Sequence, residues 1–217
     1  MLLQPFHQAK SYETGALLLY RLYGPILRRS LRATHAVVRL HAAHALAAVF
    51  PLSSPTGILP AMTQACEALE GLLEDPDDRV RVAGIQTAGQ VLGVYWASVP
   101  STTLRSILNT LITILASDAR NANVRAAVVT AIADLLEHPL THAVLRPLLP
   151  ALGNLLHDRV EAVRTATVRM LLRIKTTRGF KYYHVVPLHH LLSRLAAESK
   201  TTGPVAQALT ALMLNSY

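Results

Sequence analysis

Cysteine, aromatic residues and charged residues are scarce in this chain. Its 217 residues contain a single cysteine, Cys66, so no disulfide can form within the chain. A lone cysteine in a helical pattern indicates a reducing compartment, and we interpret Cys66 as a small buried apolar residue. Aromatic residues make up 5% of the chain and charged residues 16%, whereas 51% of the residues are hydrophobic. This composition excludes a disordered tail and favours close-packed helices.

The sequence also lacks the motifs of catalysis and metal binding. It contains no Gly-X-Ser-X-Gly and no Gly-rich phosphate loop ending in Gly-Lys-Ser or Gly-Lys-Thr. Asp75, Asp77 and Asp78 precede a predicted helix, where capping explains them better than acid–base chemistry. The ten histidines include no His-Glu-X-X-His arrangement, and zinc needs three or four converging ligands. We therefore predict a non-enzyme with no metal and no cofactor.

No segment is predicted to cross a membrane. The apolar stretch at 42–59 is interrupted by Pro51 and Pro55, and the uncharged stretch at 82–104 contains two glutamines and Pro100. The first residues include no long apolar segment of the kind that directs secretion. We expect no membrane partner.

Four copies of a Val-Arg dipeptide recur at a nearly regular interval along the chain. The copies are Val38-Arg39, Val80-Arg81, Val124-Arg125 and Val163-Arg164, at intervals of 42, 44 and 39 residues. The last three copies follow an aspartate by five or six residues, at Asp75, Asp118 and Asp158. This period in a helical composition is typical of stacked helix pairs of the HEAT or armadillo kind. We predict an all-α fold, an α-solenoid of about five HEAT-like helix hairpins.

The period predicts one array over residues 1–217, with units at about 14–50, 59–96, 100–138, 141–175 and 186–217. In the second unit, a helix over 59–74 is followed by a turn whose aspartates cap a helix over 79–96. Pro147 and Pro150 fall inside the leading helix of the fourth unit, 141–157, where they predict a kink, as Pro25 does in the first. The last helix is apolar and has no polar cap, so we expect a piece of a longer solenoid.

We interpret the repeated aspartate and arginine as structural rather than as a ligand site. The valine is expected to face the core, and the arginine to reach the aspartate or the carbonyls of a neighbouring turn. The predicted structural set is Asp75, Arg81, Asp118, Arg125, Asp158 and Arg164. A repeated binding ladder is not favoured, because contacts between neighbouring units provide the stability of a one-dimensional stack.

Positive charge concentrates near the two ends of the chain, which has a net charge of +8. In the segment from Arg169 to Tyr183, basic side chains on a helix end continue into a loop among three aromatic residues, as phosphate-backbone contact requires. The predicted DNA-contact residues are Arg169, Arg173, Lys175, Arg178 and Lys181. The alternative is a solvated basic face with aromatic residues packed beneath it. A weaker basic patch comprises Arg21, Arg28, Arg29 and Arg32, where solvated charge is favoured.

An ordered set of short segments carries a family resemblance. The set comprises Leu72-Leu-Glu-Asp-Pro76, Val80-Arg81, Tyr95-Trp96, Leu148-Leu-Pro-Ala-Leu152, Leu155-Leu-His-Asp158, Val163-Arg164, Met170-Leu-Leu-Arg-Ile-Lys175 and Leu214-Asn-Ser-Tyr217. The chain resembles the G-type non-SMC HEAT-repeat subunit of condensin II over residues 67–217, and most densely over 148–175. The first unit resembles the family only in its pattern.

The resemblance implies a fragment of a longer, non-catalytic scaffold in the nucleus, on chromosomes. It implies docking on the kleisin subunit of condensin II and, through it, on SMC subunits that carry the ATPase activity. It also implies contact with DNA, chromatin and histone tails during mitotic chromosome condensation. The alternative is a generic HEAT adaptor that binds an acidic protein segment in transport or signalling.

Overall fold

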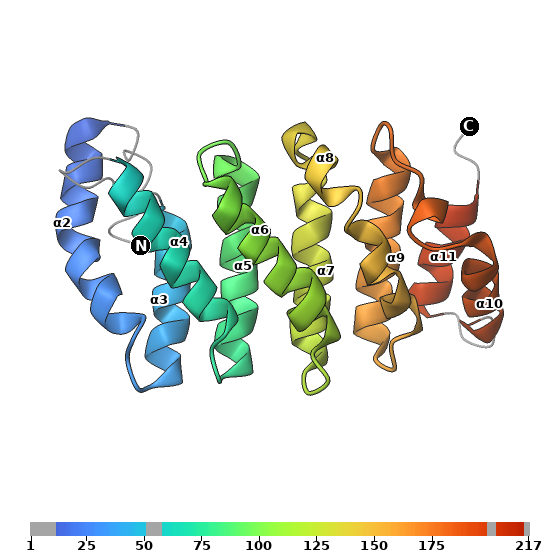
Figure 1. The fold of residues 1–217 in the computed structure, drawn as a ribbon. Helices are drawn as coiled ribbons and strands as arrows, with labels where there is room; N and C mark the ends of the chain where they lie inside the picture. The colour runs from blue at the N-terminus through green and yellow to red at the C-terminus, as the bar shows by residue number, and fades with distance from the viewer. Residues whose placement is uncertain (1–11, 51–57, 199–202, 215–217) are drawn as a thin grey trace. The chain divides into compact units, whose positions relative to one another are not determined.

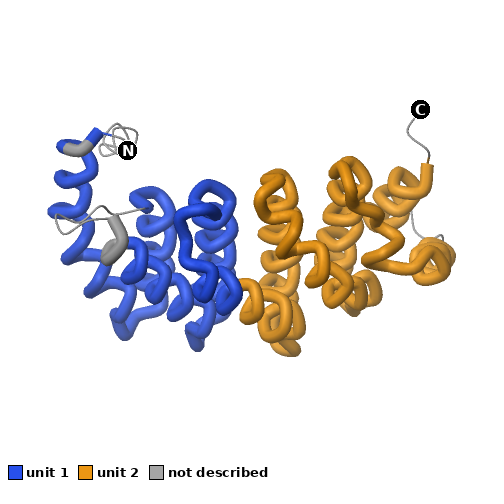
Figure 2. Tube along the Cα trace, turned by 45° about the horizontal axis from the view of Figure 1, so that its top comes forward, with its two compact units in different colours: residues 1–107 blue, residues 108–217 orange. Residues whose placement is uncertain are grey.

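Helix hairpins make up the described parts of the chain. The computed structural model describes residues 12–50, 58–198 and 203–214, and every regular element within these ranges is a helix (Figure 1). The chain forms two compact units, each of which spans more than one of the predicted repeats: the first unit is residues 1–107 and the second unit is residues 108–217 (Figure 2). Within each unit, successive helix pairs pack on one another as in an α-solenoid, so the predicted all-α fold class is confirmed.

The first unit contains α2 (Glu13–Ser30), α3 (Ala36–Val49), α4 (Ile58–Leu73) and α5 (Asp78–Tyr95), together with most of α6 (Ser101–Asn109). Helix α5 packs against α4, its partner in the hairpin, and against α3 of the preceding hairpin. Leu46, Leu69, Ile85 and Leu92 are buried in the resulting core. The same helix therefore closes its own hairpin and joins it to the previous one.

Local sequence explains how α5 begins and how closely it packs. The Asp77 side chain accepts a hydrogen bond of 3.0 Å from the Arg79 amide, which satisfies one of the free donors at the start of the helix. At Gly84, a Cβ would lie 2.9 Å from the Cβ of Leu72 on α4 and 3.1 Å from its carbonyl oxygen. Glycine is needed here because α4 and α5 are nearly in backbone contact.

The second unit contains α7 (Ala122–Leu135), α9 (Glu161–Thr176), α10 (Leu188–Glu198) and α11 (Pro204–Met213), with shorter helical segments between them. These are η2 (Thr110–Ile114), η3 (Leu115–Ser117), η4 (Pro139–Thr141), α8 (His142–Leu145), η5 (Leu149–His157) and η6 (Tyr182–His184). Helices α7, α9 and α11 lie side by side (Figure 1). Val128, Ile132, Leu152, Val168 and Leu171 are fully buried around α7 and α9.

The leading segments of the third and fourth hairpins depart from the continuous helix expected in the third and from the kinked helix expected in the fourth. The third widens into a π-helical turn at η2, and the fourth is broken rather than kinked: α8 ends at Leu145 and the 3₁₀ segment η5 follows. Pro147 and Pro150 have no amide hydrogen, and their rings obstruct the carbonyls four residues earlier. Tighter bonds replace the α-helical pattern, such as that from the Leu148 amide to the Leu145 carbonyl at 2.9 Å. Pro25, in contrast, lies within a continuous α2.

The valines of the repeated dipeptide are buried with one exception. Val80, Val124 and Val163 are fully buried, as is Val205 one period later. Val38 is 42% exposed, so the expectation that every such valine faces the core is wrong in the first hairpin. The described part of the chain places no helix pair before that hairpin, and Val38 has correspondingly less to pack against.

Candidate functional site

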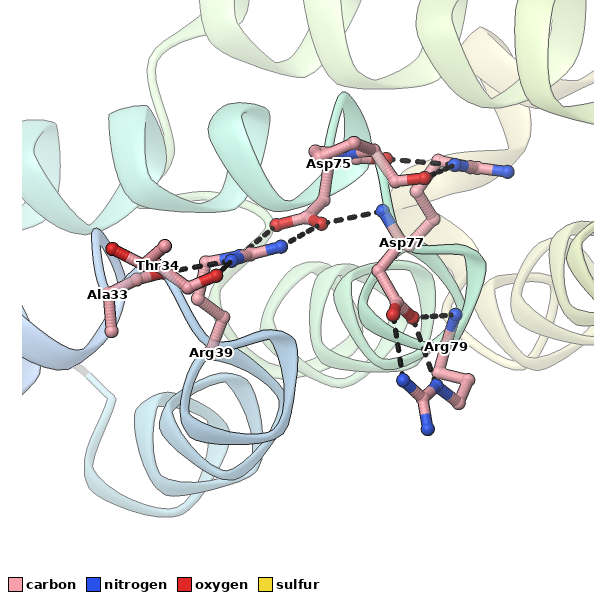
Figure 3. Close-up of polar contacts among 8 residues, drawn as sticks. Ala33, Thr34, Arg39, Asp75, Asp77 and Arg79 are labelled. Carbon is pink, nitrogen blue, oxygen red and sulfur yellow. Dashed lines mark hydrogen bonds and ion pairs between the residues drawn. The ribbon is translucent and has the colours of Figure 1, made fainter.

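Three of the four repeated arginines, Arg39, Arg125 and Arg164, bridge to a carboxylate of the following hairpin, and the first two do so through two hydrogen bonds. In the first unit, Arg39 donates from Nε and Nη2 to the two carboxylate oxygens of Asp75 at 2.6 and 2.8 Å (Figure 3). Its Nη1 donates to the carbonyl oxygens of Ala33 and Thr34, in its own turn, at 2.8 and 2.9 Å. The Asp75 carboxylate also accepts the Asp77 amide at 2.9 Å. One guanidinium thus ties two successive turns together.

The second unit repeats this geometry between α7 and the turn before α9. Arg125 donates to the two carboxylate oxygens of Asp158 at 2.7 and 2.9 Å, and to the Asp118 carbonyl oxygen at 2.6 Å. Both side chains are only 7% exposed. Burial alone would raise the pKa of Asp158, but the hydrogen bonds from Arg125 and the Val160 amide, together with the nearby arginine charges, outweigh it, and the pKa lies below its ordinary value.

A third bridge uses a glutamate where an aspartate would be expected. Arg164 donates from Nε to Glu198 at 2.9 Å and from Nη1 to the Asp158 carbonyl oxygen at 3.0 Å. Arg194 also donates to Glu198, whose pKa is lowered chiefly by that hydrogen bond. Our sequence reasoning missed Glu198 and Arg39 as bridge residues. The signal was available for Glu198, because it follows Asp158 by 40 residues, which is one period of the array.

Arg81 and Asp118 also stabilise the turns in which they lie. Arg81 donates from Nη1 to the carbonyl oxygens of Asp75 and Pro76 at 2.8 and 3.2 Å. The Asp118 carboxylate accepts the amides of Arg120 and Asn121 at 2.8 and 2.9 Å. These bonds hold the turns that begin α5 and α7. The bridge arginines use their donors within the protein, which leaves them poorly placed to bind a ligand.

The five predicted DNA-contact residues fall into two groups according to their contacts. Arg173 is paired with Asp134 at 2.9 Å and with Glu137 at 2.6 Å, both on or just beyond α7. Lys175 donates from Nζ to the carbonyl oxygens of Leu214 and Leu212 at 2.5 and 3.1 Å, which caps the end of α11. These two cations therefore have partners inside the second unit.

The other three cations are more available. Arg169, Arg178 and Lys181 are exposed, and none of them forms an ion pair with any residue that the structure describes. The Lys181 ammonium lies 5.6 Å from the centre of the Tyr183 ring, a cation–π contact. Exposed cations without a carboxylate partner are the ones that can neutralise a phosphate.

The loop that carries Arg178 and Lys181 is anchored rather than free. Phe180 packs edge-on against His142, with ring centres 4.9 Å apart, and the Arg146 guanidinium lies 5.0 Å from the centre of the same ring. Gly179 has a φ of 83°, a left-handed conformation that glycine adopts without strain. Arg146 is exposed and adds a cation that our sequence reasoning missed, because it comes from the leading segment of the hairpin. We call Arg146, Arg169, Arg178 and Lys181 the open cations.

The weaker basic patch lies along α2 and just beyond its end. All four of its arginines, Arg21, Arg28, Arg29 and Arg32, are exposed. Arg28 donates from Nε to the Gly24 carbonyl oxygen at 3.3 Å. Together with Arg32 and Glu67 of α4 it lines a cavity of about 460 Å³. The facing glutamate reduces the positive potential of this patch.

Histidine and cysteine do not form a reactive centre in the described ranges. Near the start of α10, the His190 ring lies edge-on to that of His157 and tilted against that of His189. Among the described residues, no group of three or more His, Cys, Asp or Glu side chains could hold a metal ion. Cys66 is buried, and burial raises the pKa of its thiol to about 11. In the part of the chain that the structure describes, no helix is long and apolar enough to span a membrane.

Comparison with known proteins identifies relatives along nearly the whole chain. A family model described as the condensin II non structural maintenance of chromosomes subunit matches residues 1–54. The chain is 38% identical to the condensin-2 complex subunit G2 of Homo sapiens and 37% identical to that of Danio rerio. Each match covers 98% of this chain but 19% of the relative, so the chain spans about a fifth of the length of these proteins.

A solved structure shares the fold. A designed armadillo repeat protein in complex with the peptide (KR)4 matches with a TM-score of 0.60 and 18% identity, covering 98% of this chain and 91% of that one. This likeness establishes an armadillo-like or HEAT-like helical solenoid.

Proposed function

We propose that this chain is a member of the family of condensin II G2 subunits, of whose length it spans about a fifth, and that it acts as a non-catalytic scaffold segment of a condensin II-like complex. Three buried carboxylate bridges between successive hairpins support a rigid scaffold role, because they join neighbouring repeats where a solenoid derives its stability. In this proposal the segment acts in the nucleus on mitotic chromosomes, and its partners are a kleisin and, through the kleisin, SMC ATPase subunits.

We propose further that the second unit contacts the DNA backbone through the open cations. The observation that carries this proposal is that Arg146 lies against Phe180 of the loop that also bears Arg178 and Lys181. None of these three cations has a carboxylate partner among the described residues. Because Phe180 and Gly179 hold the loop in place, little conformational entropy is lost when a phosphate is bound. Arg173 and Lys175 are expected to contribute less, since binding DNA would cost them the contacts that they already make.

The salt dependence of duplex DNA binding tests this proposal. Each phosphate contact contributes about 0.9 to the slope of log affinity against log salt concentration. The double variant Arg178→Gln, Lys181→Gln is therefore expected to reduce that slope by about 1.8. The matched control is Arg105→Gln, Arg120→Gln, which removes two exposed arginines outside the loop and its neighbours. Equal slopes for the wild type and the loop variant would refute DNA contact at this site.

Kleisin binding is tested by co-purifying the chain, extended to the length of its relatives, with a kleisin subunit. Retention of the kleisin through size-exclusion chromatography is the expected result. Loss of the kleisin from the extended chain would favour the generic adaptor over a condensin scaffold. Histone-tail binding is measured with the same extended chain and labelled tail peptides.

A further inference from the structure

A groove of about 760 Å³ runs along α7 and α9 in the second unit and reaches Pro204 at the start of α11. Much of its lining consists of small side chains, Ala126, Thr130 and Ala133 on α7 and Ala162 and Ala166 on α9. Small side chains on two adjacent helices leave room for the main chain of a ligand to approach both helices closely. The groove is therefore shaped for a thin, extended ligand rather than for a bulky one.

One face of α9 places two opposite charges in this groove. Glu161, Thr165 and Arg169 line it at four-residue spacing, so their side chains lie one above another on the helix. Neither Glu161 nor Arg169 forms an ion pair with a residue that the structure describes, whereas Arg173, the next residue on that face, is paired with Asp134. Eight residues of α-helix separate the two unpaired charges by about 12 Å.

Thr165, midway between them, has a buried hydroxyl with no hydrogen-bond partner. The residue is 8% exposed, and its Oγ1 is the one buried side-chain polar atom in the described ranges that lacks a partner. Thr113, Thr130, Thr167 and Thr210 each donate their hydroxyl to the carbonyl oxygen four residues earlier. An unpaired buried hydroxyl is destabilising. A rotation about χ1 between staggered positions would turn the Thr165 hydroxyl towards the groove, where a ligand can pair with it.

We propose that this groove binds an extended protein segment carrying a basic side chain for Glu161 and an acidic side chain for Arg169. A main-chain carbonyl between them accepts the Thr165 hydroxyl. An extended chain advances about 3.3 Å per residue, so the 12 Å between the charges corresponds to about four residues. The ligand is then a segment with Lys or Arg and Asp or Glu about four positions apart. This goes beyond the proposed scaffold role and DNA contact.

The spacing is tested with labelled twelve-residue peptides and the full 217-residue chain. Each peptide carries one Lys and one Glu in an otherwise uncharged Ser/Ala sequence, at separations from two to seven and in both orders. Fluorescence polarisation at low salt is expected to give the highest affinity at a separation of four, in one order only, about tenfold above separations of two and seven. Affinities that are independent of separation, or no binding by any peptide, overturn the proposal.

Thr165→Val tests the hydroxyl without changing the shape of the side chain. It is expected to weaken the best peptide about fivefold, and the matched control Thr167→Val, whose hydroxyl is bonded within the helix, to leave it unchanged. The double variant Glu161→Arg, Arg169→Glu is expected to reverse the preferred order of Lys and Glu in the peptide. An equal effect of the two threonine variants, or an unreversed order in a variant whose circular dichroism matches the wild type, overturns the proposal.

Glu161→Gln separates peptide binding from DNA binding, which share Arg169. The peptide proposal predicts that this variant binds the best peptide about tenfold more weakly, while its DNA affinity stays the same or rises. If the groove binds DNA instead, Glu161→Gln will bind the duplex more tightly and the peptide as well as the wild type does. That result would show that the peptide proposal is wrong. Loss of DNA binding in the loop variant alone would leave the peptide result intact, so the two proposals fail separately.

Discussion

Replacing Arg125 with methionine removes the guanidinium from the bridge between α7 and the turn before α9. The wild-type guanidinium donates to both carboxylate oxygens of Asp158 and to the Asp118 carbonyl oxygen, at 2.6 to 2.9 Å. Methionine retains much of the aliphatic stem, so the change is mainly the loss of charge and donors. The Asp158 carboxylate, 7% exposed, is left with the hydrogen bond that it accepts from the Val160 amide at 2.8 Å.

The expected loss of stability is about 3 kcal/mol, at the lower end of the cost of breaking a buried pair, because the Val160 bond remains. Asp158→Asn keeps an oxygen for the Val160 amide and for Arg125, and we expect it to cost about 1–2 kcal/mol. A double-mutant cycle is expected to show a coupling of about 1–2 kcal/mol. In a chain of this size, the Arg125→Met loss corresponds to a Tm about 6–12 °C lower.

Urea unfolding followed by far-ultraviolet circular dichroism measures these free energies, and hydrogen exchange locates the loss in α7 and α9. The pKa of Asp158 is lower in the folded chain than the value of about 3.9 in the unfolded chain. The stabilisation is therefore fully present above the unfolded value and is lost as pH falls through the folded pKa. The difference in the free energy of unfolding between the wild type and Arg125→Met should therefore become smaller below about pH 4. If Arg125→Met lowers the free energy of unfolding by less than about 0.5 kcal/mol at neutral pH, or by the same amount in acid as at neutral pH, the bridge does not stabilise the fold as argued.

Two further predictions concern a close backbone approach and a buried thiol. A Cβ on Gly153 would lie 2.6 Å from the Val185 carbonyl oxygen, so Gly153→Ala is expected to destabilise the second unit by about 1–3 kcal/mol in thermal melts. A Cβ on Gly71 in α4 would have no described neighbour within 4 Å outside its own turn of the helix, so Gly71→Ala should stabilise the folded chain by about 0.5–1 kcal/mol. Equal effects of the two glycine substitutions would contradict this packing. Burial raises the pKa of Cys66 to about 11, so Ellman's reagent should label it slowly in the native chain at neutral pH and rapidly in urea. Rapid native labelling would show that the thiol is accessible.

The helical fold was predictable because its signals are local. The Val-Arg period and the turn aspartates mark the starts of α5, α7 and α9, and an aspartate such as Asp77 caps its helix with a hydrogen bond from the amide two residues later. Such contacts depend little on distant residues. The resemblance to condensin II could also be recognised from short segments, and relatives that match 98% of the chain confirm this resemblance.

The effect of the prolines on the helices could be predicted only in part from the sequence. Pro147 and Pro150 predicted a disturbed helix, but the balance between a kink and a break depends on what the freed backbone can pack against. In the structure, η5 packs on α9, and Gly153 lets it approach the backbone at Val185. The neighbouring segments therefore stabilise a 3₁₀ geometry that is less favourable in isolation.

The sequence by itself determined that this protein is a row of helix hairpins with basic zones near both ends. Only the tertiary structure decided which charges remain available to a partner. Arg173 meets Glu137, 36 residues earlier, and Lys175 meets Leu212, 37 residues later. Glu198 replaces the aspartate of the last bridge, and Thr165 is left without a partner beside a groove. The physical reason is that hydrogen bonds within a turn are specified by neighbours in sequence, whereas partners one repeat away depend on how the hairpins stack.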